Sequence, residues 1–168
     1  MKMLLLSACL MLAGLQAVAA EPSAQDYVAR HLPSPEQRVL WLTPPLKQRV
    51  EALLGHAYPG LRVRYWQQGA RTAWVLDEIG KEQPITTGIV VEQGRILDIA
   101  VLAYRESRGG EVRQSFFTRQ FTGASLTTRD ALTQRVDGIS GATLSVRAMQ
   151  NMARLALLLD AQRGQPQP

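Results

Sequence analysis

The chain has 168 residues, of which 19 are Lys or Arg and 14 are Asp or Glu, and its formal net charge is +5 at pH 7. This length suits one domain with a modest hydrophobic core. The single cysteine, Cys9, lies in the N-terminal leader described next. The rest of the chain therefore excludes a disulfide framework, a cysteine-based metal site and a catalytic thiol.

Residues 1–20 are typical of a signal peptide. A short basic start is followed by an almost wholly apolar run, residues 3–15, and then by small residues. The run is shorter than the ~20 apolar residues that a membrane-spanning helix needs. We therefore expect export to the periplasm, a mature chain that starts near Glu21, and no nucleic acid partner. A lipoprotein cleavage pattern also ends at Cys9, so lipid anchoring through this residue is the minor alternative.

Residues 21–60 predict a helical N-terminal section. Its first part, residues 21–33, is polar without a sustained period and is interpreted as a lead-in. Residues 34–37 place a serine before a proline and a glutamine, a pattern typical of a helix start, and Thr43 before two prolines repeats it. The second of these helices carries apolar residues at three- and four-residue steps, and Gly55 is placed to end it.

Four runs rich in β-forming residues follow and predict two hairpins. Residues 61–66 alternate in polarity and are joined by a short turn to residues 71–79. Residues 84–91 and 95–102 form a second pair, joined by a turn that contains glycine. These runs predict a mostly antiparallel sheet of four or more strands.

The C-terminal half predicts a loop with paired glycines at residues 106–110, a short helix at residues 116–121 and a long helix at residues 142–159. The long helix contains no glycine or proline, and its broad apolar face indicates packing on the sheet. Residues 162–168 form a polar tail. The predicted fold class is α+β, with a main domain at residues 61–161, a helical N-terminal section, and a long C-terminal helix packed on the mostly antiparallel sheet.

The segment DGISGATLS, residues 137–145, carries the clearest chemical signal, because it opens the long helix. Asp137 and Ser140 are residue types that cap helices, and Gly141 allows a tight backbone before the first turn. That turn offers unpaired N–H groups and the positive end of the helix dipole, which favour a phosphate. Thr143 presents a hydroxyl where such a phosphate would lie.

Three motifs of this half resemble those of a known family, the FMN-binding domain of the Rnf complex G subunit, of the C subunit of the sodium-translocating NADH:quinone oxidoreductase, and of many small exported bacterial proteins. Residues 137–145 meet the family pattern Asp-x-x-Ser/Thr-Gly-Ala-Thr with a following Ser or Thr. Residues 106–110 resemble the family's loop of glutamate and threonine followed by glycines. Residues 117–123 resemble the family's aromatic-Gln-Phe-x-Gly segment. The loop departs from the family pattern at Ser107, where threonine is usual, and at Arg108, where proline is common.

The resemblance implies that FMN is attached through a phosphoester to the hydroxyl of Thr143. A separate FAD-dependent, magnesium-requiring flavin transferase would make this bond. The implied cofactor-binding residues are Thr143, Asp137, Ser140, Gly141, Ala142, Leu144, Glu106 and Ser107. For Glu106 and Ser107 two roles stay open, which are contact with the polar edges of the flavin and the ordering of a surface turn.

We expect an electron carrier rather than an enzyme, with a membrane electron-transfer protein as partner, because no nucleophile-base pair is present. No catalytic residue is predicted. His31 and His56 show no ligand spacing, so no metal site is predicted. The alternatives are a small flavin-dependent reductase that acts on a soluble substrate, and a divergent binding module without redox function.

Overall fold

The structure is a computed structural model and describes residues 21–164. The predicted signal peptide with Cys9 and the last residues of the polar tail lie outside this range. The elements in chain order are α1 (Ala24–His31), β1 (Glu36–Trp41), α2 (Pro44–Leu54), β2 (Arg62–Gln68), β3 (Arg71–Ile79), β4 (Pro84–Glu92), β5 (Arg95–Tyr104), η1 (Gly110–Arg113), α3 (Ser115–Thr118), η2 (Arg119–Phe121) and α4 (Thr143–Gln162).

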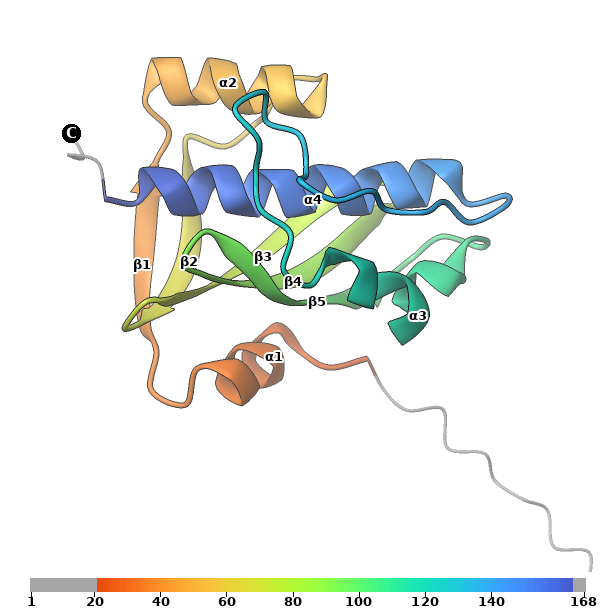
Figure 1. Cartoon of the computed structure of the whole chain (residues 1–168), viewed down its shortest axis with the longest axis horizontal. Helices are drawn as coiled ribbons and strands as arrows, with labels where there is room; N and C mark the ends of the chain where they lie inside the picture. The colour runs from red at the N-terminus through yellow and green to blue at the C-terminus, as the bar shows by residue number, and fades with distance from the viewer. Residues whose placement is uncertain (1–20, 165–168) are drawn as a thin grey trace, which may run out of the picture.

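The five strands form one antiparallel sheet in the order β1-β2-β3-β4-β5, so that each strand pairs with the next along the chain. Helices lie on both faces of this sheet (Figure 1). The long helix α4 packs on one face with α2 beside it, and α1 packs on the other. The predicted α+β class, with a long C-terminal helix on a mostly antiparallel sheet, is confirmed.

The main core lies between the sheet and α4. Trp74 is fully buried there and stacks on Tyr65, with ring centroids 4.6 Å apart. Met149 of α4 is also fully buried in this layer. On the other face, the ring of Tyr27 lies directly over Gly88, where a Cβ would come within 2.5 Å of the ring. The absence of a side chain at this glycine therefore lets α1 pack closely on β4.

A buried polar network ties the end of α4 to β3. The Thr72 hydroxyl donates to Asp160 Oδ1 at 2.6 Å and accepts the indole N–H of Trp74 at 2.9 Å. Arg163 donates to the same carboxylate at 2.9 Å. Each buried polar group in this network has a partner, which fixes the position of α4 along the sheet.

The local signals of the strands and of the two longer helices predicted these elements correctly. The helix α2 ends at Gly55, whose φ of +80° is the left-handed conformation of a glycine C-cap. The turn between β4 and β5 places Gln93 and Gly94 at φ values of 51° and 71°, which suits a two-residue hairpin loop. The predicted long helix begins at Thr143 and extends to Gln162.

Two elements of the N-terminal section differ from the prediction. The helix expected after Ser34 is wrong, because Glu36–Trp41 forms the edge strand β1, in which Leu40 pairs with Val63. Leu40 is the one buried residue of this strand, so pairing with β2 rather than a local period stabilises it. The expected lead-in contains α1, Ala24–His31, which is capped by the Ser23 hydroxyl.

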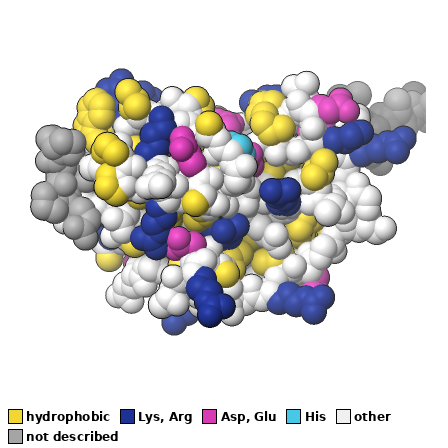
Figure 2. Space-filling model, turned by 90° about the horizontal axis from the view of Figure 1, so that it is seen from above, with side chains coloured by type: hydrophobic (Ala, Val, Ile, Leu, Met, Phe, Trp, Pro, Cys, Tyr) yellow, Lys and Arg dark blue, Asp and Glu magenta, His cyan; other side chains and the backbone are white. Residues whose placement is uncertain are grey.

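Charged side chains are dispersed over the face that carries α2, where basic residues lie among acidic, apolar and uncharged ones (Figure 2). Within residues 21–164, no group of three or more His, Cys, Asp or Glu is placed to hold a metal ion. Among the helices of the same range, none combines the length and the apolar character that crossing a membrane requires.

Candidate functional site

The loop after β5 packs against the first turn of α4. Gly109 in this loop has a φ of +83°, and a Cβ at this position would lie 2.9 Å from Tyr104 Oη, 3.1 Å from Ala142 Cβ and 3.2 Å from Ser145 Oγ. Glycine is therefore required here for its backbone conformation and for the close approach. The glycine loop and the DGISGATLS segment, which the sequence marked separately, form one site.

Tyr104 at the end of β5 joins the two parts of this site. Its hydroxyl donates to the carbonyl of Arg108 and lies 3.0 Å from Ser145 Oγ. Because the tyrosine proton goes to that carbonyl, the Ser145 hydroxyl donates to Tyr104. The guanidinium of Arg113 lies 5.5 Å from the centroid of the tyrosine ring and pairs with Glu21 at 3.0 Å. Sequence reasoning missed Tyr104, whose only local signal was the end of a strand.

The helix α4 begins without a side-chain cap. Its N-cap residue is Ala142, and no side chain accepts a hydrogen bond from the first turn. Asp137 and Ser140, which are residue types capable of capping a helix, do not cap this one. Gly141, at a φ of +77°, turns the chain just before the helix. The Asp137 carboxylate is 78% exposed and lies 3.5 Å from Arg135 Nε. The first N–H groups of α4 are thus left open to an anion.

Two adjoining hollows open beside this helix start, with volumes of about 360 Å³ and 640 Å³. Four residues, Glu106, Ser107, Arg108 and Gly141, line both hollows. The smaller one also contains Lys81, Glu82, Ala142, Thr143, Leu144 and Ser145, and the larger one Tyr104, Gly109, Gly110, Glu111, Arg113, Gln114 and Ser140. Of the predicted site residues, Asp137 alone lines neither.

Thr143 and Ser145 differ sharply in their environment. Thr143 is exposed in the first turn, and within residues 21–164 its hydroxyl makes no hydrogen bond. Ser145 is only 4% exposed and is bonded to Tyr104. The hydroxyl of Thr143 is therefore available to a ligand in the smaller hollow, whereas that of Ser145 supports the loop.

Glu106 orders the turn between β3 and β4. One of its carboxylate oxygens, Oε1, accepts the backbone N–H groups of Lys81, Glu82 and Gln83 at 2.5, 2.7 and 3.0 Å. These donors, foremost that of Gln83, stabilise the charged form and hold the pKa of the Glu106 carboxyl below its ordinary value. Of the two roles predicted for Glu106, the structure shows the ordering of a turn, and this turn forms one wall of the smaller hollow.

Arg108 is the cation at the centre of the site. Arg105 and Arg119 each donate a hydrogen bond to a nearby backbone carbonyl, and Arg113 pairs with the carboxylate of Glu21. In the part of the chain that the structure describes, the Arg108 guanidinium has no hydrogen-bond or ion-pair partner, although it lines both hollows. Its charge is therefore free for an anionic ligand.

Residues 80–158 match the family model of the FMN-binding domain. This part of the chain is an FMN-binding domain. The match begins at the turn that Glu106 orders and includes Thr143 and most of α4, so both hollows lie largely within it. The elements α1, β1, α2, β2 and β3 precede the matched range. A search among curated proteins gave no similar sequence.

The groups at the helix start suit the FMN that the FMN-binding domain takes as its cofactor. An uncapped helix N-terminus and the unpaired guanidinium of Arg108 favour a phosphate group. The exposed hydroxyl of Thr143 and the side chain of Leu144, which is 44% exposed, lie beside them. When bound, FMN supplies the capacity to take up and release electrons, and the protein supplies its position and electrostatic environment.

Proposed function

We propose that this protein is an exported electron carrier that holds FMN through a phosphoester on Thr143. The observation that carries the proposal is the position of the Thr143 hydroxyl. Thr143 is exposed, and its hydroxyl makes no hydrogen bond within the described range. It lies at the uncapped start of α4 and lines the smaller hollow. Neither a base beside this hydroxyl nor a catalytic pair is needed in this chain, because a separate transferase would perform the attachment.

The attachment would exchange one phosphate linkage for another. Thr143 Oγ1 forms a bond to the phosphorus of the FMN half of FAD, the pyrophosphate bond to the AMP half breaks, and the hydroxyl proton leaves with AMP. Arg108 and the first N–H groups of α4 would hold the phosphate during and after this exchange. Such contacts are worth about 0.3–1 kcal/mol each at exposed sites, so they position a phosphate but do not retain a cofactor in a dilute compartment. A covalent bond retains it.

The neighbouring hydroxyls are less suitable for this reaction. Ser145 is buried and donates its proton to Tyr104. Ser140 precedes the helix and is separated from its first turn by Gly141 and Ala142. Thr143 alone among these three combines exposure with a place in the first turn of α4.

The N-terminal leader supports export, and the structure is compatible with cleavage near Glu21. The Glu21 carboxylate accepts the backbone N–H of Tyr104 at 3.3 Å and pairs with Arg113. Both of these residues line the larger hollow. A mature chain that starts near this residue would begin beside the flavin site, and its partners would be the flavin transferase and a membrane electron-transfer protein.

Intact mass after denaturation tests the proposal. The protein is produced together with a flavin transferase, and the wild type should stay yellow and be heavier by one FMN less one water. Thr143→Ala should abolish the added mass, Thr143→Ser should retain it because the hydroxyl is kept, and Ser145→Ala should retain it as the matched control. Added mass that survives Thr143→Ala would contradict the proposed attachment site.

A further inference from the structure

The helix α1 covers only part of the sheet face on which it lies. Ala73 of β3 is fully buried in the cluster that α1 forms with this face. The following side chains of β3 on the same face become more exposed: Val75 is half-buried, and Asp77 and Ile79 are exposed. The end of this face near Ile79 therefore lies outside the cover of α1.

The pairing of the strands extends this part of the face to β2 and β1. Directly paired residues of neighbouring strands lie on the same face of a sheet. Trp66 pairs with Ala73, so the side chains of β2 on the face of α1 are those of Trp66, Arg64 and Arg62. Their partners in β1 lie on this face too. We call the following residues the uncovered face: Val39, Trp41, Arg62, Arg64, Asp77 and Ile79.

The uncovered face presents large apolar side chains to solvent. Val39, Trp41 and Ile79 are 38%, 42% and 54% exposed. Within residues 21–164, they are three of the seven large apolar side chains that are exposed. An antiparallel sheet face that lies in water normally carries polar side chains. Apolar side chains gathered on such a face are typical of an interaction surface.

The same face is basic. The Arg62 guanidinium lies 5.5 Å from the centroid of the Trp41 ring, and within residues 21–164 the Arg64 guanidinium has neither a hydrogen-bond nor an ion-pair partner. The carboxylate of the face, Asp77, accepts the Thr86 hydroxyl at 2.5 Å, and Arg105 donates to the same hydroxyl at 3.1 Å. Because Arg105 balances the charge of Asp77, the charges of Arg62 and Arg64 remain available to an anionic partner.

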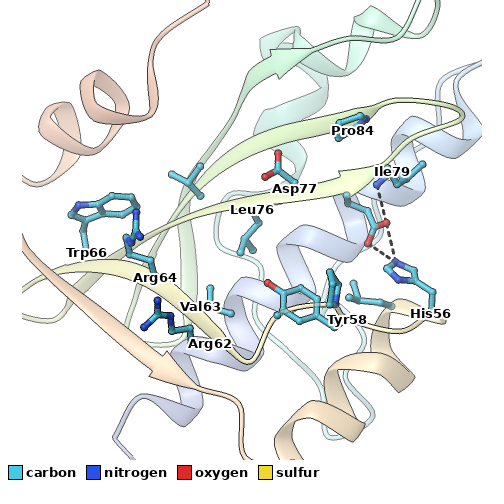
Figure 3. Close-up of a pocket in the computed structure, with 15 residues that line it drawn as sticks. His56, Tyr58, Arg62, Val63, Arg64, Trp66, Leu76, Asp77, Ile79 and Pro84 are labelled. Atoms are coloured by element: carbon cyan, nitrogen blue, oxygen red, sulfur yellow. Dashed lines mark hydrogen bonds and ion pairs between the residues drawn. The ribbon is translucent and has the colours of Figure 1, made fainter.

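A hollow of about 580 Å³ opens in this face between β2 and β3 (Figure 3). The ring of Tyr58 lies between the two strands and packs against the main core, so it forms a floor for the hollow. Arg62 and Arg64 line the hollow from β2, and Ile79 lines it from β3. The arginines thus stand beside a recess in an otherwise apolar surface.

We propose that the uncovered face binds the surface of a membrane that contains anionic phospholipids. Trp41, Val39 and Ile79 would enter the interfacial layer, in which tryptophan is favoured. Arg62 and Arg64 would contact lipid phosphates, and the hollow beside them gives room to a headgroup.

The arrangement of these side chains favours a membrane over a protein. The apolar residues come from β1 and β3 and the arginines from β2 between them, so the contacts spread over an area. An extended segment would follow a single row, whereas the membrane interface offers apolar and anionic groups over a whole area. A second copy of this chain would place arginines against arginines, which disfavours self-association through this face.

The uncovered face lies next to the FMN site. Ile79 ends β3, and the turn after it is the one that Glu106 orders along the smaller hollow. Binding through this face would hold the flavin beside the membrane, where the proposed electron-transfer partner lies. The binding itself needs no flavin and involves residues that precede the FMN-binding domain match. It can therefore fail or succeed independently of the proposed attachment to Thr143.

Co-sedimentation with vesicles tests the binding. The protein is the mature chain from Glu21, produced without a flavin transferase. It should sediment with vesicles of equal parts phosphatidylcholine and phosphatidylglycerol and much less with phosphatidylcholine alone. Salt should weaken the binding, because the screening length falls from about 10 Å at 0.1 M to about 3 Å at 1 M. Equal sedimentation with both kinds of vesicle, or with neither, would overturn the proposal.

Charge variants locate the binding on the sheet. An arginine near an anionic surface contributes about fivefold to partitioning, so Arg62→Gln/Arg64→Gln should bind about 25-fold more weakly. The matched control is Arg129→Gln, which removes an exposed charge outside the uncovered face and should bind as the wild type does. An unchanged affinity of the double variant, or an equal loss in the control, would contradict the assignment.

Apolar variants test the other half of the surface. Val39→Thr should weaken binding, because it removes apolar area and keeps a β-branched side chain in the strand. Leu97→Thr is the matched control, since Leu97 is also 38% exposed but lies in β5 at the opposite edge of the sheet. Equal effects of the two variants would contradict a specific face.

An acidic polypeptide distinguishes a protein partner from a membrane. Soluble polyglutamate carries the negative charge of an acidic protein surface without a lipid interface. It should change the fluorescence of Trp41 far less than the anionic vesicles do, as measured by the signal that Trp41→Phe removes. A response to polyglutamate without a response to the vesicles would indicate an acidic protein surface and overturn the membrane proposal.

Discussion

Replacement of Gly109 by alanine should destabilise the protein for two reasons, the backbone conformation of this residue and its close packing against the start of α4. Alanine at a φ of +83° carries a strain of about 1–2 kcal/mol. The new Cβ would also press on Tyr104 Oη at 2.9 Å, Ala142 Cβ at 3.1 Å and Ser145 Oγ at 3.2 Å. Overpacking of this kind costs about 1–3 kcal/mol. The free energy of unfolding should therefore fall by about 2–5 kcal/mol.

Gly123 is a matched control for the strain alone. Its φ is +82°, and an added Cβ at this position meets no atom within 4 Å. Gly123→Ala should lower the free energy of unfolding by only about 1–2 kcal/mol. Urea unfolding followed by tryptophan fluorescence measures both variants. The same pair can be compared for FMN attachment, which Gly109→Ala should reduce because it displaces the loop from the helix start, and Gly123→Ala should leave unchanged. Equal destabilisation of the two variants would refute the close packing of Gly109 on α4.

Three further predictions concern other parts of the chain. The folded-state pKa of Glu106 is lowered, so its charge contributes stability above the unfolded-state pKa, and this contribution is lost as the pH falls through the folded-state pKa. The difference in unfolding free energy between wild type and Glu106→Gln should accordingly vanish in acid, and a difference that grows in acid would contradict this. Thr72→Val should cost about 1–3 kcal/mol in urea unfolding, because the Trp74 indole and Asp160 lose a buried partner, and a neutral effect would count against the network. Terminal sequencing of the exported protein should begin near Glu21, whereas a lipid-modified cysteine at the N-terminus would favour the anchored alternative.

The elements that the sequence predicted correctly are those with strong local signals. The period of α4, the glycine at Gly55 and the turn at Gln93 and Gly94 all determine structure through their immediate neighbours. The strand β1 and the helix α1 were not predicted; contacts distant in sequence stabilise both, although α1 also carried a local signal, the cap of the Ser23 hydroxyl on the N–H of Asp26. One pairs with β2, and the other places Tyr27 over β4. Local propensity is weak where such tertiary contacts decide the conformation.

In the site, too, the features that local sequence determines were predicted, and those that depend on contacts between distant residues were not. The DGISGATLS segment and the family resemblance sufficed to select Thr143, and the glycines of the loop predicted a close approach. The bridge from Tyr104 to Ser145 and the turn held by Glu106 join residues far apart in the chain, so no local pattern reveals them. Asp137, a residue type that could cap α4, does not do so, and its carboxylate lies beside Arg135 instead.

Peptide mapping of the flavinylated protein tests the central claim most directly. Trypsin cleavage after Arg135 and Arg147 releases the peptide of residues 136–147, whose only hydroxyl side chains are Ser140, Thr143 and Ser145. Fragmentation of this peptide assigns an attached FMN to one of the three. The proposed function predicts the added mass on Thr143 alone. Added mass on either serine, or an unmodified peptide from protein produced with an active flavin transferase, would contradict it.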